Sequence, residues 1–369
     1  ARVSFMHLMS KLIVFSVVWL VVLVRTIEPQ VTTQAPKPTC FTFNATLYCD
    51  TLSLTDVLPT IANFTSSGEI FYSIQIDCTC SQTCAAEHLN DTSFTENTKI
   101  HRLNINSCNI VSMAPETLTP FQNLTWFRIY RAGLNNLPQA AIRGIGKLEG
   151  IELYASLIRS ITPGLWNLKY LIMFNNHIRT LSQGVFLALG NLEILELGGN
   201  SLPLLKDYSF DGLGNLKHLL FVKNKLEEME NGTLHGLGML LSLDLKNNKI
   251  TVLPHGVFTG LSSLTDLSME QNLISNLTEG SFVGLHNLEL LHLSKNNIQM
   301  IEKGAFRDLG KLLRLNLSEN QIMGLGKGRF EELSSLMYLH LDSNNITSLE
   351  EGSFCLSPPL PSITNAKLP

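Results

Sequence analysis

The sequence is poor in charged residues and has no basic excess. Charged residues make up 16% of its 369 residues, and the formal net charge is -4. Proteins that bind nucleic acids through an electrostatic surface carry a strongly basic balance, so this composition predicts no nucleic-acid partner. The low charge also argues against any partner held mainly by bulk electrostatic attraction.

Catalytic motifs are missing too. The chain contains no G-x-S-x-G, no H-E-x-x-H and no phosphate-binding G-x-x-x-x-G-K-[ST] pattern. Its ten histidines do not pair with a cysteine or an acid in a recognisable arrangement. We therefore expect that the protein is not an enzyme and that it holds no cofactor or metal ion.

Long apolar runs are limited to one, the thirteen residues 12–24 between Lys11 and Arg25. A bilayer-spanning helix needs about 20 apolar residues and a signal-peptide core about 7–15, so residues 1–26 are predicted to be a signal peptide. An uncleaved signal anchor is the alternative. Because the first residue is Ala1, we expect either a fragment or a translation start at Met6 or Met9. The prediction is a secreted or extracellular protein with no membrane span after signal removal, and association with the cell surface stays open.

What the sequence does contain is a repeat. The pattern L-x-x-L-x-L-x-x-N-x-L returns every 24 residues, and the ninth place holds Asn176, Asn200, Asn224, Asn248, Asn272, Asn296, Asn320 and Asn344. Alternating apolar residues predict a short strand with one buried face in each repeat. The asparagine is expected to satisfy backbone groups within and between coils. Phenylalanines with the same period, from Phe186 to Phe354, are expected to fill the convex side.

This pattern resembles the typical 24-residue class of extracellular leucine-rich repeat proteins, to which the ectodomains of Toll-like receptors, Slit, chaoptin and variable lymphocyte receptors belong. The resemblance covers residues 100–354 and implies an α/β solenoid. This is a horseshoe with a parallel concave β-sheet of about eleven repeats.

Extracellular members of this family usually carry a cysteine-rich cap, and residues 40–99 fit one. A Pro/Thr-rich linker over residues 27–39 precedes this segment, in which cysteine density predicts disulfides among Cys40, Cys49, Cys78, Cys80 and Cys84. The odd number leaves one thiol, which either pairs with Cys108 or stays reduced. A metal site at Cys78, Cys80 and Cys84 is the alternative, but no histidine sits at ligand spacing. No carboxyl-terminal cap is recognisable, and residues 355–369 are predicted to be a degenerate or truncated tail.

The repeats that break the pattern point to the candidate site. The asparagine place holds Ala132 in repeat two and Ser156 in repeat three, and repeat three is four residues short. The outward strand places of repeats two to four hold Trp126, Arg128, Tyr130, Glu152, Tyr154, Tyr170, Ile172 and Phe174. Exposed aromatic clusters with arginine are typical of interface hot spots. The alternative is that the cap or a loop folds over these side chains and makes them core.

Eight N-x-S/T triplets agree with a secreted glycoprotein, and a glycan on Asn316 would obstruct the carboxyl-terminal concave surface. The glycosylation candidates are Asn44, Asn63, Asn90, Asn123, Asn231, Asn276, Asn316 and Asn345.

These features together predict a binding module in immune recognition, adhesion or development, which recognises a protein or glycoconjugate through repeats two to four. A truncated Toll-like receptor ectodomain and a structural matrix protein are the alternatives, and a homodimer stays open.

Overall fold

The chain divides into two units, residues 1–36 and 37–369. The computed structural model describes residues 38–51, 53–66, 71–79, 86–90, 94, 99–136, 138–142, 144–161, 168–353 and 362–364, all within the second unit. The predicted signal peptide and nearly all of the predicted linker lie outside the described residues.

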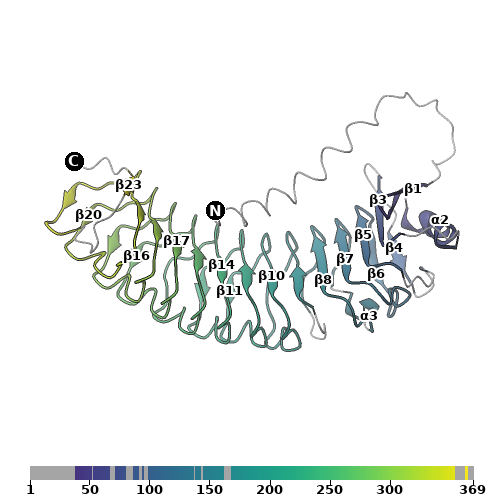
Figure 1. The fold of residues 1–369 in the computed structure, drawn as a ribbon, viewed down its shortest axis with the longest axis horizontal. Coiled ribbons are helices and arrows are strands. Elements are labelled where there is room, and N and C mark those ends of the chain that lie inside the picture. The colour runs from purple at the N-terminus through teal and green to yellow at the C-terminus, as the bar shows by residue number, and fades with distance from the viewer. Residues whose placement is uncertain are drawn as a thin grey trace, which may run out of the picture. The chain divides into compact units, whose positions relative to one another are not determined.

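The second unit is a solenoid built on one fifteen-stranded sheet (Figure 1). Its strands, in their order across the sheet, are β1 (Thr39–Phe43), β2 (Thr46–Thr51), β3 (Ser73–Cys78), β5 (Arg102–Asn106), β7 (Trp126–Tyr130), β8 (Gly150–Tyr154), β9 (Tyr170–Ile172), β10 (Ile194–Glu196), β12 (His218–Leu220), β14 (Ser242–Asp244), β15 (Asp266–Ser268), β17 (Leu290–His292), β19 (Arg314–Asn316), β21 (Tyr338–His340) and β23 (Ser362–Thr364). Eleven of these strands, β5 to β21, are the strands that the repeat pattern predicts.

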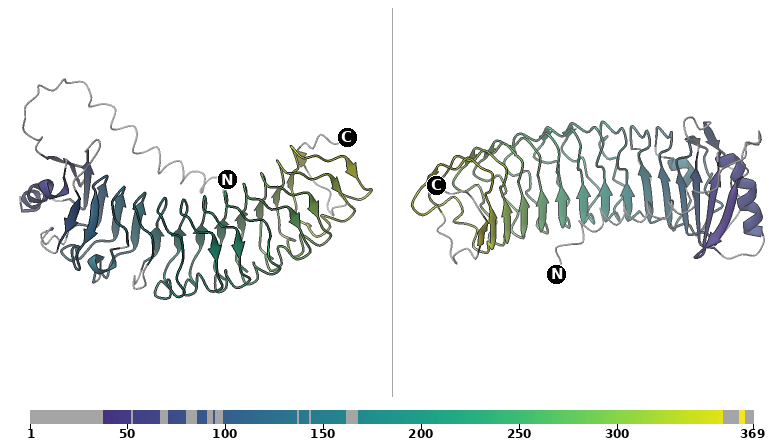
Figure 2. Two further views of the ribbon diagram at one scale, coloured as in Figure 1. Left: turned by 180° about the vertical axis from the view of Figure 1, so that it is seen from behind. Right: turned by 90° about the horizontal axis from the view of Figure 1, so that it is seen from above.

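The parallel register follows the period of the sequence. Leu195 pairs with Leu219, and Leu219 pairs with Leu243, each 24 residues apart. These leucines are at most 1% exposed, because alternate side chains of each strand point into the coil. Side chains at the intervening places line the opposite, concave face of the sheet, which Figure 2 shows from above.

The sheet continues beyond the predicted array at both ends. β2 and β3 join β5 in parallel, β1 folds back antiparallel on β2, and β23 pairs with β21. The amino-terminal cap is therefore not only a cover over the first coil, since it contributes strands to the same sheet. The leucine pattern does not mark β1, β2 and β3, so the sequence analysis missed these three strands.

The cap also holds a helix, α2 (Leu54–Ser66), which buries Leu54, Val57 and Ile61. These residues recur at helical spacing and form one apolar stripe. The Glu87 carboxylate accepts hydrogen bonds from the Leu54 N–H at 2.9 Å and from the Ser53 hydroxyl at 2.5 Å. An acceptor with negative charge satisfies a free N–H at the start of a helix, so Glu87 fixes where α2 begins.

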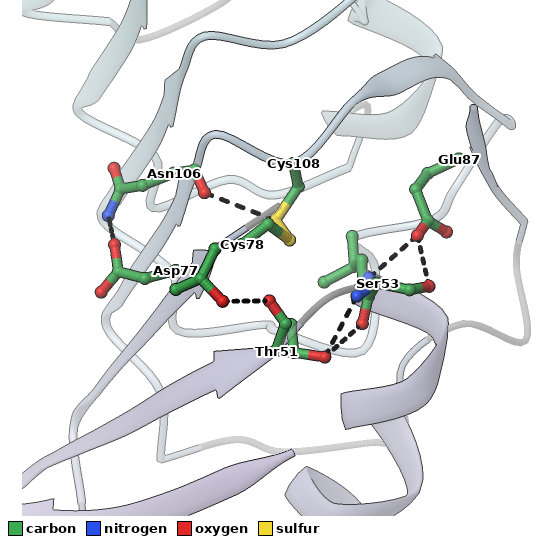
Figure 3. Close-up of a disulfide and its surroundings, with 9 residues drawn as sticks. Thr51, Ser53, Asp77, Cys78, Glu87, Asn106 and Cys108 are labelled. Atoms are coloured by element: carbon green, nitrogen blue, oxygen red, sulfur yellow. Dashed lines mark hydrogen bonds between the residues drawn. A yellow bond between two sulfur atoms is a disulfide. The ribbon is translucent and has the colours of Figure 1, made fainter. Parts of the chain in front are cut away.

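Two disulfides lie within the cap and its junction with the repeats. Cys40 of β1 is bonded to Cys49 of β2, and Cys78 of β3 is bonded to Cys108 just after β5 (Figure 3). Cys108 occupies the ladder place of the first repeat, so there a covalent bond stands where later repeats use asparagine. Cys80 and Cys84 lie outside the described residues.

The asparagine ladder has the predicted role. The Asn248 amide donates to the Leu245 carbonyl of its own coil at 2.9 Å and to the Phe221 carbonyl of the preceding coil at 2.9 Å. Its Oδ1 accepts the Leu226 N–H at 3.1 Å. Asn200, Asn224, Asn272, Asn296, Asn320 and Asn344 repeat this arrangement.

The convex side is filled by stacked rings, as predicted. Phe258, Phe282 and Phe306 are fully buried, and their neighbouring ring centroids lie 6.1 Å apart with interplanar angles of 9° and 6°. Leu234 fills the gap in this series and is 1% exposed, whereas Phe354 lies outside the described residues.

Outside the main sheet, the described coils are mostly turns with very short elements. These are α3 (Gln139–Ile142), β4 (Glu87–Leu89), β6 (Ile110–Met113), β11 (Leu204–Leu205), β13 (Glu228–Met229), β16 (Asn276–Leu277), β18 (Met300–Ile301), β20 (Gly324–Leu325) and β22 (Ser348–Leu349). Among the helices of the described ranges, none is long and apolar enough to cross a bilayer.

Candidate functional site

The eight predicted site residues lie together on three adjacent strands. β7 and β8 pair with Arg128 opposite Glu152 and with Tyr130 opposite Tyr154. β8 and β9 pair with Glu152 opposite Ile172. Phe174 lies two residues after the end of β9. We call these eight residues the aromatic patch: Trp126, Arg128, Tyr130, Glu152, Tyr154, Tyr170, Ile172 and Phe174.

All members of the aromatic patch are half-buried, and none is enclosed. Their side chains are therefore not the fully buried core that the alternative, in which the cap or a loop folds over them, would require. Partial exposure arises because neighbouring side chains on the concave face cover one another.

Trp126 sets the layout of one edge of the patch. Its indole lies over Gly150 of the next strand, where a Cβ would overlap the ring. It thereby reaches Tyr170 two strands away, with 5.3 Å between ring centroids. The indole N–H donates to Glu152 Oε1 at 2.8 Å. Only glycine at residue 150 leaves room for the Trp126 ring to cross β8 and reach β9.

Arg128 and Glu152 form the polar centre. Arg128 Nε lies 3.1 Å from Glu152 Oε2, although the pair is not aligned as a hydrogen bond. The guanidinium carbon lies 5.3 Å from the centroid of the Tyr154 ring. Burial, and then the nearby Glu152 carboxylate, raise the pKa of the Tyr154 hydroxyl. Tyr154 therefore stays neutral at physiological pH and offers a hydrogen-bond donor to the concave side.

The other edge is aromatic. Tyr154 and Phe174 have centroids 6.3 Å apart at an interplanar angle of 56°. Tyr130 is packed by the Arg131 guanidinium, whose carbon lies 5.0 Å from its centroid. The ladder hydrogen bonds beneath this edge are long. Ser156 Oγ accepts from the Ala132 N–H at 3.4 Å and donates to the Tyr154 carbonyl at 3.3 Å.

Glu196 of β10 extends the patch, and the sequence analysis did not single it out. It lies in register with Ile172 on one side and Leu220 on the other. Burial raises the pKa of its carboxyl to about 8. In a sequence, one glutamate between apolar residues is typical of a solvated strand face, so no signal marked it.

The leucine-rich repeat family model matches residues 166–226, 219–274, 239–298, 267–322, 286–346 and 312–363. These matches cover more than half of the 369 residues. The chain belongs to the leucine-rich repeat family.

Two solved structures are similar to this chain. An internalin (inlF) from Listeria monocytogenes is 20% identical, with a TM-score of 0.55, and the match covers 80% of this chain and 81% of that one. TLR13 in complex with ssRNA13 is 21% identical with a TM-score of 0.47, and covers 78% of this chain. This chain spans 56% of the TLR13 chain. Comparison with curated proteins gave no match. At 20% identity the likeness to the internalin shows the fold alone.

The carboxyl-terminal leucine-rich repeats present a different concave face. Their outward places hold mainly polar and charged groups, and Tyr338 is stacked by Arg314, whose guanidinium carbon lies 4.9 Å from the ring centroid. Asn316 is half-buried on this face, and its Oδ1 accepts from the Ser318 N–H at 3.0 Å and from the Ser318 hydroxyl at 2.7 Å. The serine of this N-x-S triplet is thus already bonded to the asparagine that a glycan would occupy.

The other N-x-S/T asparagines lie away from the aromatic patch. Asn123 is half-buried at the start of a repeat, where its Oδ1 accepts from the Lys147 ammonium at 2.5 Å. The exposed ones are Asn44, Asn63, Asn90, Asn231, Asn276 and Asn345.

The residues that the structure describes include no group of three or more His, Cys, Asp or Glu side chains placed to hold a metal ion. A pocket between the starts of the repeat strands, near Glu149 and Lys217, is lined by charges that pair with each other. Lys169 lies 2.9 Å from Glu149, and Lys217 lies 2.7 Å from Glu193. The pocket therefore has little unpaired charge with which to hold a ligand.

Proposed function

We propose that this leucine-rich repeat protein is a non-catalytic binding module and that the aromatic patch is its contact surface for a protein partner. The observation that carries the proposal is a set of half-buried rings on adjacent repeats, in which Trp126 contacts Tyr170 and Tyr154 contacts Phe174. Aromatic side chains and arginine dominate the energetics of protein interfaces because they bury large areas at low entropic cost.

Preorganisation supports the same proposal. Trp126 is fixed by Glu152 and Tyr170, and Arg128 is fixed between Glu152 and Tyr154. Side chains that are already ordered lose little rotamer freedom when a partner binds, so more of the contact energy appears as affinity. Elsewhere on the concave face, the described residues show one such contact, between Arg314 and Tyr338.

The proposal places the protein outside the cell. Two disulfides support this, since such bonds persist in oxidising compartments, and the N-x-S/T triplets agree with it. The net charge of -4 favours a protein partner over a nucleic acid. A glycoconjugate is the alternative ligand class, to be separated by experiment.

The test is a binding screen of the secreted protein against a panel of extracellular proteins and a glycan array. Each ligand found is titrated against the double variant Tyr130→Ala/Phe174→Ala, for which we expect an affinity loss of at least ~100-fold, the product of two hot-spot truncations. The matched control is Tyr338→Ala, which removes an exposed ring from the same face of repeat eleven.

Equal affinity of the correctly folded double variant and the wild type would show that binding occurs elsewhere. If the partner is a second copy of the chain, the same variant shifts sedimentation from dimer to monomer, and Tyr338→Ala does not.

A further inference from the structure

The Glu196 carboxylate has one polar contact and no cation. Its Oε1 accepts the Gly198 N–H at 2.7 Å. No lysine, arginine or histidine of the described residues forms an ion pair with it, and no cation contributes to its titration. Ile172 and Leu220 flank it in register. The charged and titratable groups that act on it are the Asp244 carboxylate, which raises its pKa further, and the Tyr154 hydroxyl, so Glu196 lies among apolar and acidic groups without a cation from the described residues.

Two other glutamates on the concave face have a cation beside them, although burial also raises the pKa values of Asp244 and Asp266 on this face. Glu152 lies 3.1 Å from Arg128, and Glu270 lies 2.5 Å from Lys246. Burial acts to raise the pKa of Glu270, but the hydrogen bond and the charge of Lys246 outweigh it and lower that pKa. At Glu196 nothing outweighs burial. A half-buried carboxylate of this kind gains most from a cation that arrives with a ligand.

The surroundings favour a flat cation. A methyl group built on Gly198 would come 2.6 Å from Glu196 Oε1 and 3.0 Å from Phe174 Cδ2, so carboxylate and ring meet over this glycine. Tyr154 of repeat three packs against Phe174 of repeat four. Val222 of repeat six, the repeat after that of Glu196, is half-buried. A guanidinium can bond to a carboxylate and stack on a ring at once, and it is more weakly hydrated than an ammonium.

We propose that Glu196 and Phe174 form an arginine subsite at the end of the aromatic patch, which receives one arginine side chain of the protein partner. The subsite rests on the proposed function, because it continues the same surface. The incoming guanidinium keeps Glu196 ionised, so at neutral pH binding releases the proton that burial retains there. Glu196 would then favour partners that carry an arginine at this point of the interface. The aromatic rings of the patch would supply most of the buried contact area.

The test uses two randomised octapeptide mixtures that differ only in having arginine or its neutral isostere citrulline at the fifth position. We expect the wild-type protein to retain the arginine mixture about tenfold more strongly, the size of one charge-assisted contact. In Glu196→Gln, which keeps an oxygen for the Gly198 N–H, the preference should fall below about twofold. Glu270→Gln, the same change on the same face, should leave the preference intact.

Equal retention of the two mixtures by the wild type, or an arginine preference that survives Glu196→Gln, would overturn the subsite. A different variant tests the proposed function itself. If Tyr130→Ala, far from Glu196 along the patch, leaves retention of both mixtures unchanged, the patch is not the contact surface, whatever Glu196 does. If Tyr130→Ala weakens both mixtures equally and arginine gives no preference, the patch binds and the subsite is wrong.

Discussion

Repeats two to four and repeats five to eleven share one sheet but differ in what they stabilise. In the later repeats each ladder asparagine holds two coils together, and the concave face carries mainly polar and charged groups, some of them in ion pairs. In repeats two and three Ala132 and Ser156 replace the ladder asparagine, and the contacts on the concave face are instead made between Trp126, Glu152, Tyr154 and their neighbours. Regular coils thus supply rigidity, while the irregular ones present side chains to a partner.

The largest effect on stability is expected from a substitution in the convex side of the regular repeats. Phe282→Ala removes a ring stacked between Phe258 and Phe306, so we expect a loss of about 3–5 kcal/mol in the free energy of unfolding. Coils of a solenoid contact mainly their neighbours, so hydrogen exchange should accelerate over residues 250–330 more than over the aromatic patch. Val252→Ala, at a side chain 65% exposed, is the control with little expected change. A uniform response over all repeats would contradict this local picture.

The second test compares the two kinds of ladder place directly. Asn248→Ala removes amide hydrogen bonds to the Phe221 and Leu245 carbonyls, each of which keeps one from a neighbouring ladder asparagine. It also leaves the buried Leu226 N–H without its acceptor, and should cost about 2–3 kcal/mol. Ser156→Ala removes two long hydrogen bonds and should cost about 1 kcal/mol. Urea unfolding of both variants measures the difference. Equal losses would show that the serine ladder is as strong as the asparagine ladder.

A third prediction concerns pH. Burial raises the pKa of Glu196 to about 8, above the ordinary value of 4.5, so the folded protein retains a proton that the unfolded chain loses. Stability should therefore fall as pH rises from about 4.5 through about 8. Glu196→Gln should abolish its share of that decline and give a relative gain on the order of 2 kcal/mol at pH 9.

Thermal melts of both proteins between pH 4.5 and 9 measure this share. Asp244 and Tyr154 interact electrostatically with Glu196, so the variant also lowers their pKa values, and the measured difference includes these couplings. Parallel curves for variant and wild type would refute the assignment to Glu196.

The smallest effect is expected at Gly150, which lies beneath the Trp126 ring in the irregular repeats. Gly150→Ala places a methyl group against the Trp126 indole, which must move away from Tyr170, and we expect a cost of about 1 kcal/mol. Tryptophan emission should shift to the red as the indole becomes wetter. Gly146→Ala, where a Cβ would meet nothing within 4 Å, should leave emission unchanged. An unchanged spectrum for Gly150→Ala would show that the indole is not seated over this glycine.

The repeat strands, the ladder and the phenylalanine spine could be predicted because each depends on residues of the same type 24 places apart. The membership of the aromatic patch followed from strand alternation alone. Its contacts did not, since Trp126 over Gly150 and Arg128 beside Glu152 depend on which rotamers fit together across strands.

The cap was harder to predict. The pairing of Cys78 with Cys108 requires β3 to lie beside β5, and nothing in the spacing of cysteines fixes that neighbour. Glu196 was missed for a related reason. Its lack of a cation depends on the side chains of the strands on either side, which period and hydropathy do not describe.

The reach of the ladder bonds has a consequence for how the gene can change length. Each ladder asparagine contacts its own coil and the preceding one, so duplicating or excising a whole coil restores every bond at the new junction. Shorter deletions are also tolerated in the convex half, as repeat three shows, since it is four residues short. The side-chain amide of Asn176 in the next repeat still donates to the Leu153 carbonyl at 2.7 Å and accepts from the Ile158 N–H at 3.3 Å. Insertions and deletions that leave the stretch from strand to asparagine intact should therefore be inherited without loss of the fold.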